Sequence, residues 1–353
     1  MKILFVQEIP EIRSIKTSLM LREHGHHVDC VTTAALSSFR NDLGGIKPFN
    51  SEFTIKDKFH LPGIFEGYDL IHFHNSPDRI GLITLAGDKP VIWDCHDLVT
   101  TLDIKDPRGS DEIIEFFLYH KSQGSIFASR GFKNECEEKY TKSKTPSIIT
   151  ENYPAKWMIP KEKLPKLSDK DKKIHIVYAG SISEERENHR FFYPLFKKLT
   201  SLSDQIVLHV YPAISPRATK LKVGQQIVLD QFNFYKIPSD TLIIHKPVSV
   251  IDLIKELSQY DFGLLPFNKA YQFTQLFTPN KLYEYSAAGL KILSQHYETV
   301  DEVSKDWENI IYYDRIDGSL LKQLQNHSQL KIPIVPVFED QYKQYLKIYE
   351  EVI

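Results

Sequence analysis

Short apolar runs separated by polar segments of helical spacing recur along the whole chain. The first run, Lys2–Gln7, is followed by a loop with a proline, a helix-like segment near Ser14–His24 and a second run at His27–Thr32. Apolar runs of this length are typical of strands that are buried on both faces of a parallel sheet. The opening therefore predicts a β-α-β unit, and further strands are predicted at four places: Leu70–His74, Pro90–Cys95, Gly124–Ser129 and Pro146–Thr150.

The pattern is interrupted once and then begins again. The segment Ala155–Lys173 is rich in lysine and proline and poor in aromatic residues, which is typical of a linker. Beyond it, strands are predicted at Ile174–Gly180, Gln205–Tyr211, Thr241–His245, Phe262–Phe267 and Lys291–Ser294. A chain of 353 residues is too long for one ordinary core. We therefore predict an α/β protein with two doubly wound, Rossmann-like parallel-sheet domains. The first domain is expected at residues 1–155 and the second at 174–336, joined by a linker at 156–173. A terminal helix at 337–353 is expected to pack back on the first domain.

Composition and charge narrow the classes of function. The net charge is −2 and no long basic run occurs outside the linker, which argues against a nucleic-acid partner. Cys30, Cys95 and Cys136 are scattered and odd in number, so neither a disulfide framework nor a zinc cage is expected, and a reducing cytoplasm fits. No window approaches a run of about 18 apolar residues. A first-domain helix carrying Lys16 and Arg22 is too modestly basic to predict membrane docking, so we expect a solvated helix face there.

The stretch from Pro279 to Ser294 places one cation and one carboxylate on a short helix next to a strand. Thr278 is expected to cap this helix, Pro279 to fill its first position and Gly289 to end it. Lys281 and Glu284 are three residues apart, so both lie on one face. A cation there can hold a phosphate and a carboxylate can hold a diol. The alternative is a helical salt bridge worth only about 0.2–0.5 kcal/mol.

In an open parallel sheet, ligands bind at the carboxyl ends of the strands, so functional residues are expected just beyond those ends. Gly180 and Ser181 end one strand, and the segment after them is expected to begin a helix. In that helix Arg186 could donate two hydrogen bonds to a diphosphate, and an ordinary surface ion pair is an equally compatible role for it. His96 and Asp97 follow another strand. His96 is predicted to hydrogen-bond a sugar hydroxyl, with Asp97 fixing its tautomer or touching the same sugar, and the alternative is a structural histidine.

Three further patterns argue against other chemistries. The segment Gln7–Glu11 has no glycine, so the dinucleotide fingerprint is absent and a dehydrogenase is not expected. His72 and His74 share one strand face without a third ligand at suitable spacing, so no metal site is predicted. Asp169–Asp171 is formally an Asp-x-Asp, but it lies in the lysine-rich segment and is taken as a solvated charge run.

These motifs together resemble the GT-B glycosyltransferases of family four, the retaining glycosyl transferases of group 1. The likeness covers nearly the whole chain. In the first half it is carried by Leu21–Val28, Tyr68–Asn75 and Trp93–Leu98. In the second half it is carried by Val177–Ser181, Asp261–Phe267 and, most specifically, Pro279–Ser294. The resemblance implies two Rossmann-like domains facing a cleft, with the acceptor on the first and the nucleotide-sugar donor on the second.

The resemblance also implies roles for individual residues. Glu284 would accept hydrogen bonds from the ribose hydroxyls, and Lys281, beside Asn280, would contact the donor diphosphate. The backbone at Gly180 and Ser181 would approach that diphosphate, with Arg186 as a weaker candidate. His96, with Asp97, would lie on the acceptor side and face the transferred sugar.

The resemblance also implies a reaction. A hexose would be transferred from a nucleoside diphosphate sugar, of the UDP or GDP type, to a hydroxyl group, with retention at the anomeric carbon and without a metal ion. No further cofactor is expected, because protein cations can stabilise the departing diphosphate. The implied acceptor is a carbohydrate or a lipid-linked glycan in polysaccharide or glycoconjugate synthesis. The implied location is the cytoplasm, with a peripheral contact at the inner face of the membrane left open.

One position departs from the commoner family pattern, which has a second glutamate eight residues before the ribose-binding one. Here that position is Leu276, and no acidic residue occurs between Asp261 and Glu284. Two alternatives therefore remain at the level of sequence. One is a sugar-nucleotide epimerase of the same fold, and the other is a non-catalytic scaffold subunit that binds a sugar nucleotide.

Overall fold

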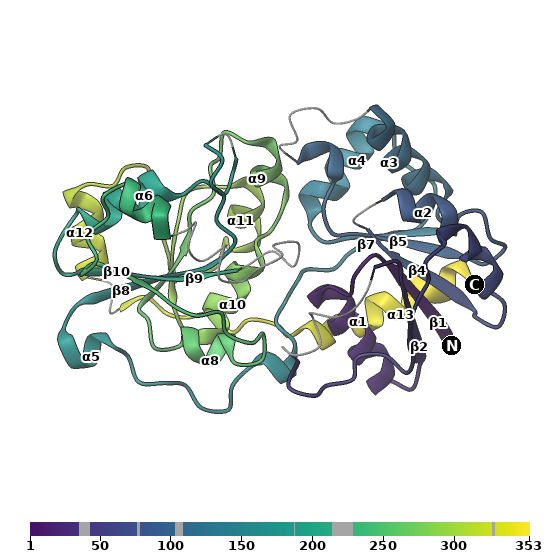
Figure 1. Ribbon diagram of the computed structural model, residues 1–353, viewed down its shortest axis with the longest axis horizontal. Helices are drawn as coiled ribbons and strands as arrows, with labels where there is room; N and C mark the ends of the chain where they lie inside the picture. The colour runs from purple at the N-terminus through teal and green to yellow at the C-terminus, as the bar shows by residue number, and fades with distance from the viewer. Residues whose placement is uncertain (35–42, 76–77, 103–108, 187, 214–228, 327–328) are drawn as a thin grey trace. The chain divides into compact units, whose positions relative to one another are not determined.

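The computed structural model describes the chain except for residues 35–42, 76–77, 103–108, 187, 214–228 and 327–328. The described residues form two compact units (Figure 1). Unit 1 contains Met1–Lys156, Gln275–Thr278 and Pro336–Ile353, and unit 2 contains Trp157–Thr274 and Pro279–Val335.

Unit 1 is built on a seven-stranded sheet in which the described strands pair in parallel, in the order β3-β2-β1-β4-β5-β6-β7. The strand order reverses between β1 and β4, and the carboxyl ends of these strands are where an open α/β sheet binds ligands. The strands are β1 (Lys2–Gln7), β2 (His27–Thr32), β3 (Glu52–Thr54), β4 (Leu70–His74), β5 (Val91–Cys95), β6 (Gly124–Phe127) and β7 (Ser147–Ile149).

Helices cover both faces of this sheet, which explains why β4, β5 and β6 are buried along their whole length. In Figure 1, α1 and α13 lie on one face and α2, α3 and α4 on the other. The α-helices are α1 (Ile12–Glu23), α2 (Arg79–Thr84), α3 (Gly109–Lys121), α4 (Arg130–Tyr140) and α13 (Tyr342–Val352). Short 3₁₀ turns are η2 (Lys58–His60), η3 (Pro62–Ile64), η4 (Val99–Thr101), η5 (Lys156–Met158, whose last two residues belong to unit 2) and η7 (Phe338–Gln341).

Unit 2 repeats the design with a six-stranded parallel sheet in the order β10-β9-β8-β11-β12-β13. Its strands are β8 (Ile174–Gly180), β9 (Ile206–Pro212), β10 (Leu242–Ile244), β11 (Phe262–Leu265), β12 (Lys291–Ser294) and β13 (Ile310–Tyr312). Its helices are α5 (Ser168–Asp171), α6 (Tyr193–Thr200), α8 (Leu253–Leu257), α9 (Gln272–Leu276, whose last two residues belong to unit 1), α10 (Asn280–Ala288), α11 (Glu298–Val303) and α12 (Gly318–Gln325). Aromatic side chains of α6, among them Tyr193 and Phe196, pack into one face of the core.

The predicted strands are confirmed to within two residues at their ends. Two strands were not predicted, β3 and β13, each of three residues. The predicted linker is also more structured than expected. The backbone N–H groups of Leu164 and Leu167 donate to Ser258 Oγ and to the carbonyl of Gln259, at 2.8 and 2.9 Å, so this segment is bound along unit 2.

Three local expectations are wrong. Pro279 does not fill the first position of α10, because it is the N-cap residue and the helix begins at Asn280. Thr278 therefore precedes the N-cap and does not cap the helix, and the residue before a proline is held in an extended conformation. Lys16 is not on a solvated face, since it is 3% exposed and its Nζ donates to the carbonyl of Tyr153 at 2.7 Å. The predicted stop at Gly289 is confirmed by its left-handed φ of 83°. Among the helices that the structure describes, none has the length and apolar character needed to cross a bilayer.

Candidate functional site

The helix α10 is fixed against the carboxyl edge of the unit 2 sheet. It lies between the parallel strands β11 and β12, so its first turn is at the carboxyl ends of the strands. Gly263 permits this close packing, because a Cβ there would lie 2.2 Å from the ring of Tyr285. The hydroxyl of Tyr285 accepts a hydrogen bond from the backbone N–H of Ala179 at 3.0 Å. The contact brings α10 to the end of β8, where Gly180 and Ser181 follow.

Lys281 and Glu284 are paired with each other. Lys281 Nζ donates a short hydrogen bond to Glu284 Oε2. Glu284 is 7% exposed as a residue, whereas the Lys281 side chain is 22% exposed. The ion pair is therefore more buried than the surface pairs that contribute little to stability. A carboxylate has lone pairs beyond the one used here and an ammonium has three donors, so both groups can take a ligand while staying in contact.

The backbone after β8 is held in place without a helix. The hydroxyl of Tyr178 donates to the carbonyl of Ser181 at 2.6 Å, and a Cβ on Gly180 would lie 2.7 Å from that hydroxyl, so a larger residue there would displace it. The expectation of a helix opening at Glu184–Asn188 is wrong, because the next helix begins only at Tyr193. Arg186 is exposed on the intervening turn.

In unit 1, His96 stands at the end of β5 with its ring held from two sides. Its Nδ1 lies 3.2 Å from Glu11 Oε2, and its Nε2 lies 3.0 Å from Nδ1 of His74. Asn75 fixes the backbone on both sides of this point: its Oδ1 accepts from the N–H of His96 at 2.7 Å, and its Nδ2 donates to the carbonyl of Asp97 at 2.5 Å. Neutral tautomers satisfy the ring contacts if His74 donates to His96 and His96 donates to Glu11.

A buried ion pair lies beneath His96. Arg13 Nε donates to Asp94 Oδ1 at 3.0 Å, with both side chains 1% exposed or less. A second guanidinium nitrogen of Arg13 donates to the carbonyl of Thr150 at 2.8 Å. Burial alone raises the pKa of the Asp94 carboxyl, but the charge of Arg13 and the neighbouring His96 outweigh it, and the pKa of Asp94 lies far below its usual value. The charge of Arg13 therefore favours the ionised form of Asp94.

The same carboxylate completes a group of potential metal ligands, which corrects the inference that His72 and His74 have no third partner. The ligand atoms of His72, His74 and Asp94 lie within 4.8 Å of one another. Burial lowers the pKa of both histidines, so they present neutral imidazoles, as metal binding requires. However, Arg13 donates to both oxygens of Asp94, and its charge would oppose a second cation in the same buried space. We therefore assign these residues no metal.

Sequence reasoning missed Glu11, Arg13, Asn75 and Asp94. Asp94 could have been found, because a carboxylate inside the apolar run Val91–Cys95 must have a charged or hydrogen-bonded partner once buried. Its partner Arg13 is 81 residues away and is brought near only by the strand order β1-β4-β5.

Two parallel, doubly wound sheets with helices on their faces define the GT-B fold, which this chain has. No protein-family model matches the chain, and no curated protein matches it by sequence. Solved structures do match over nearly its full length.

One of these structures is Anabaena Alr3699/HepE in complex with UDP and glucose, with a TM-score of 0.68 and 11% identity, covering 100% of this chain and 98% of that one. A glycosyltransferase from Rickettsia africae matches with a TM-score of 0.67 and 12% identity, covering 99% and 98%. A UDP-N-acetylglucosamine 2-epimerase from Listeria monocytogenes matches with a TM-score of 0.63 and 12% identity, covering 99% and 96%. At such identities the likeness concerns the fold alone.

Proposed function

We propose that this protein is a glycosyltransferase that moves a hexose from a nucleoside diphosphate sugar to a hydroxyl acceptor. The observation that carries the proposal is the largely buried Lys281–Glu284 pair at the start of α10, tied through Tyr285 to the end of β8. It joins a cation and a carboxylate at the edge of the sheet where nucleotides bind in this kind of fold. The similarity to structures solved with UDP and with UDP-glucose supports it.

On this proposal, the donor is held in unit 2. Glu284 accepts hydrogen bonds from the ribose hydroxyls, and Lys281, beside Asn280, contacts the diphosphate. The backbone at Gly180 and Ser181 approaches the diphosphate, and Arg186 adds charge from its exposed turn. These cations take the role that a metal ion has in other transferases, so no metal or further cofactor is needed to stabilise the leaving group. The proposed donor is of the UDP or GDP type, and transfer proceeds with retention.

The acceptor side is assigned to His96 and Asp97 in unit 1. Both ring nitrogens of His96 have protein partners, but the Glu11 side chain is 49% exposed, so a substrate hydroxyl can replace it at Nδ1. The proposed acceptor is a carbohydrate or a lipid-linked glycan in polysaccharide or glycoconjugate synthesis. A cytoplasmic setting, with a peripheral contact at the inner face of the membrane, belongs to the same proposal.

The test is a thermal-shift titration with a panel of UDP- and GDP-sugars. A donor that binds only the folded protein, present at a concentration of about 100 times its Kd, stabilises the protein by about 2.7 kcal/mol. The correct donor should therefore give the largest increase in Tm. Glu284→Ala should abolish that shift. Glu308→Ala is the matched control, because Glu308 forms an exposed pair with Lys331 in the same unit. No shift with any donor, or an unchanged shift in Glu284→Ala, would exclude the assignment.

An epimerase is the second candidate, supported by the structural similarity to UDP-N-acetylglucosamine 2-epimerases. It would change the donor sugar without any acceptor, so chromatography of a donor incubated alone with the protein distinguishes the two activities. Donor binding with neither epimerisation nor transfer would instead indicate a non-catalytic subunit. That outcome would fit Leu276, whose carbonyl accepts a hydrogen bond from Ser129 Oγ and which offers no carboxylate to a sugar.

A further inference from the structure

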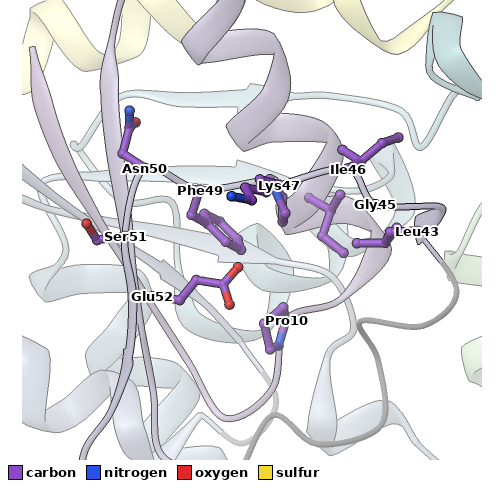
Figure 2. Close-up of a pocket in the computed structure, with 11 residues that line it drawn as sticks. Pro10, Leu43, Gly45, Ile46, Lys47, Phe49, Asn50, Ser51 and Glu52 are labelled. Atoms are coloured by element: carbon purple, nitrogen blue, oxygen red, sulfur yellow. The ribbon is translucent and has the colours of Figure 1, made fainter.

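Two pockets of unit 1 differ in the charges that line them. The pocket beside α1, of about 330 Å³, has both a carboxylate, that of Glu52, and an ammonium group, that of Lys47, in its lining (Figure 2). A second pocket, of about 400 Å³, is lined by residues of α2, of the last turns of α3 and of the start of β5. Its lining includes Lys89 and Lys121 and no acidic residue, so this pocket has a net positive charge.

The side chain of Gln123 joins the two segments that carry these lysines. Its Oε1 accepts from the backbone N–H of Val91 at 2.7 Å, and its Nε2 donates to the carbonyl of Lys121 at 3.2 Å. The backbone N–H of Gln123 also donates to the carbonyl of Val91 at 2.9 Å. Because Lys89 stands two residues before Val91, the backbone of both lysines is held beside the same pocket, and the charged side of the pocket is preformed, as ligand sites usually are.

Neither of these two ammonium groups has a partner in the part of the chain that the structure describes. Asp88, next to Lys89 in the chain, does not line the pocket and pairs with neither lysine there. The dipole of α3 favours Lys121 in its last turn even without a ligand, but this reason does not extend to Lys89, which lies beyond the end of α2. Two cations beside one pocket repel each other, and an anion between them removes that repulsion.

The rest of the lining is mainly apolar and continues onto the surface of α3. Leu82 and Leu85, at the end of α2, are half-buried, and Phe117 of α3 is 40% exposed. Ile113 lies four residues before Phe117, on the same face of the helix, and is 58% exposed. An apolar path therefore leads out of the positively charged pocket along α3.

We propose that this pocket binds an amphiphilic anion, an alkyl or acyl chain that ends in a phosphate or a carboxylate. The anionic group lies between Lys89 and Lys121, whose ammonium groups supply hydrogen-bond donors. The chain lies against the apolar side chains and leaves along Phe117. A hydrophilic anion would leave the apolar half of the site unused, and an uncharged chain would leave the lysines without a partner.

The pocket is separate from the proposed donor and acceptor positions. Val91 is the first residue of β5, whereas His96 follows the carboxyl end of the same strand. The pocket therefore lies at the opposite edge of the unit 1 sheet from the ring of His96. The proposed ligand is consequently independent of the proposed function, and it can bind whether or not the protein transfers a sugar.

The experiment is an isothermal titration of the whole protein with octyl phosphate, below the concentration at which it forms micelles. Octyl phosphate should bind about tenfold more tightly than inorganic phosphate or octanol, because each of these lacks one half of the ligand. Lys89→Gln and Lys121→Gln should each weaken its binding about fivefold, the contribution of one partly exposed ion pair. Phe117→Ser should weaken it about as much, through the loss of apolar contact.

Two matched variants control for general surface effects. Lys56→Gln and Phe59→Ser change an exposed lysine and an exposed phenylalanine of unit 1 outside the pocket, and should leave the affinity unchanged. Octyl phosphate that binds no more tightly than octanol, or equally well to wild type and both lysine variants, overturns the proposal. An affinity that is unchanged in Phe117→Ser also overturns it, because the site would then hold a bare anion.

Sedimentation with vesicles distinguishes the two sources of such a ligand. The protein is mixed with vesicles of phosphatidylcholine, and with vesicles of equal parts phosphatidylcholine and phosphatidylglycerol. Sedimentation with the anionic vesicles alone, lost when both lysines are changed to glutamine, identifies the ligand as a membrane lipid. Binding of octyl phosphate without sedimentation identifies it as a free amphiphile. Donor binding is measured separately with UDP- and GDP-sugars, so a failure of this site leaves the proposed function intact.

Discussion

Each unit contains a cluster of three histidines on adjacent parallel strands, and the two clusters are built differently. In unit 1, His72, His74 and His96 surround the ionised Asp94, which is paired with Arg13. This cluster lies under the carboxyl ends of β4 and β5. It combines a fully buried ion pair with a ring, that of His96, whose outer partner is exposed.

The cluster in unit 2 is a neutral hydrogen-bonded row. His175 Nδ1 lies 2.8 Å from His209 Nε2, and His209 Nδ1 lies 2.9 Å from His245 Nε2. The row begins at Asp171, 3.0 Å from His175 Nε2, and passes Tyr260, whose hydroxyl lies 3.3 Å from His245 Nε2. One set of neutral tautomers satisfies it, in which each ring donates toward Asp171.

The comparison teaches that charge, rather than position along the strands, separates the two clusters. His96 and His245 each directly follow the carboxyl end of a strand, where ligands bind in such sheets. In the part of the chain that the structure describes, only the unit 1 cluster has its histidines in contact with a buried ion pair, Arg13–Asp94. The sequence shows both clusters as histidines in or just after apolar runs, so the buried partner carboxylate is what distinguishes them.

The largest expected effect comes from breaking the ion pair of unit 1. Arg13→Met leaves Asp94 charged and unpaired in a site with no solvent access, which should reduce the free energy of unfolding by about 3–5 kcal/mol. Urea denaturation measures it. Asp171→Asn is the control in unit 2, since that side chain is 44% exposed and its loss should cost about 1 kcal/mol or less. Equal losses in the two variants would show that the clusters do not differ as described.

The next effect separates the clusters by activity. His96→Asn should lower the rate of sugar transfer roughly 100-fold, the cost of removing one hydrogen-bonding group from a reacting centre. His209→Asn should leave the rate of the folded protein unchanged, because His209 is buried in its row. Initial rates with a saturating donor provide the measurement. A comparable drop in both variants would place the function elsewhere.

A third prediction concerns acid. Burial, aided by His175 and His245, lowers the pKa of His209 to about 3. Above a pH of about 6.5, His209 is neutral in both folded and unfolded chains, and its row contributes fully. As the pH falls below that value, the unfolded chain gains a proton that the folded chain does not, so stability decreases by up to about 1.4 kcal/mol per pH unit.

From pH 7 to pH 5 this amounts to about 2 kcal/mol for His209. Denaturant unfolding at several pH values would show it as a slope. His209→Asn should reduce the slope, while Glu308→Ala should not. A slope that is the same in wild type and His209→Asn would mean that His209 titrates normally.

How far the sequence predicted this molecule depends on the range of the interactions. The apolar runs located β1, β4 and β5, because burial on both faces leaves a local signal. Gly289 was also predicted, since a left-handed C-cap favours glycine locally. The partner of Asp94 was not predicted, because Arg13 meets it only through the order of strands in the sheet.

The same limit applies to the candidate site. The spacing of Lys281 and Glu284 fixed their common face, and the structure confirms that they meet. The contact between Tyr285 and Ala179, which positions the helix, joins residues 106 apart and leaves no local signal. The helix predicted after Ser181 was wrong for a different reason. A run of glutamates and an arginine has good helix propensity, but it has no apolar face to bury there.

The smallest expected effect tests whether Glu11 is a replaceable partner of His96. Because the Glu11 side chain is 49% exposed, Glu11→Gln should change the free energy of unfolding by less than about 1 kcal/mol. If an acceptor hydroxyl takes its place at Nδ1, the substitution should lower the KM for the acceptor, since a neutral amide holds the ring less tightly, and leave the KM for the donor unchanged. An unchanged acceptor KM would mean that Glu11 stays on His96 during the reaction, and the outer side of the unit 1 cluster would then be as closed as the row in unit 2.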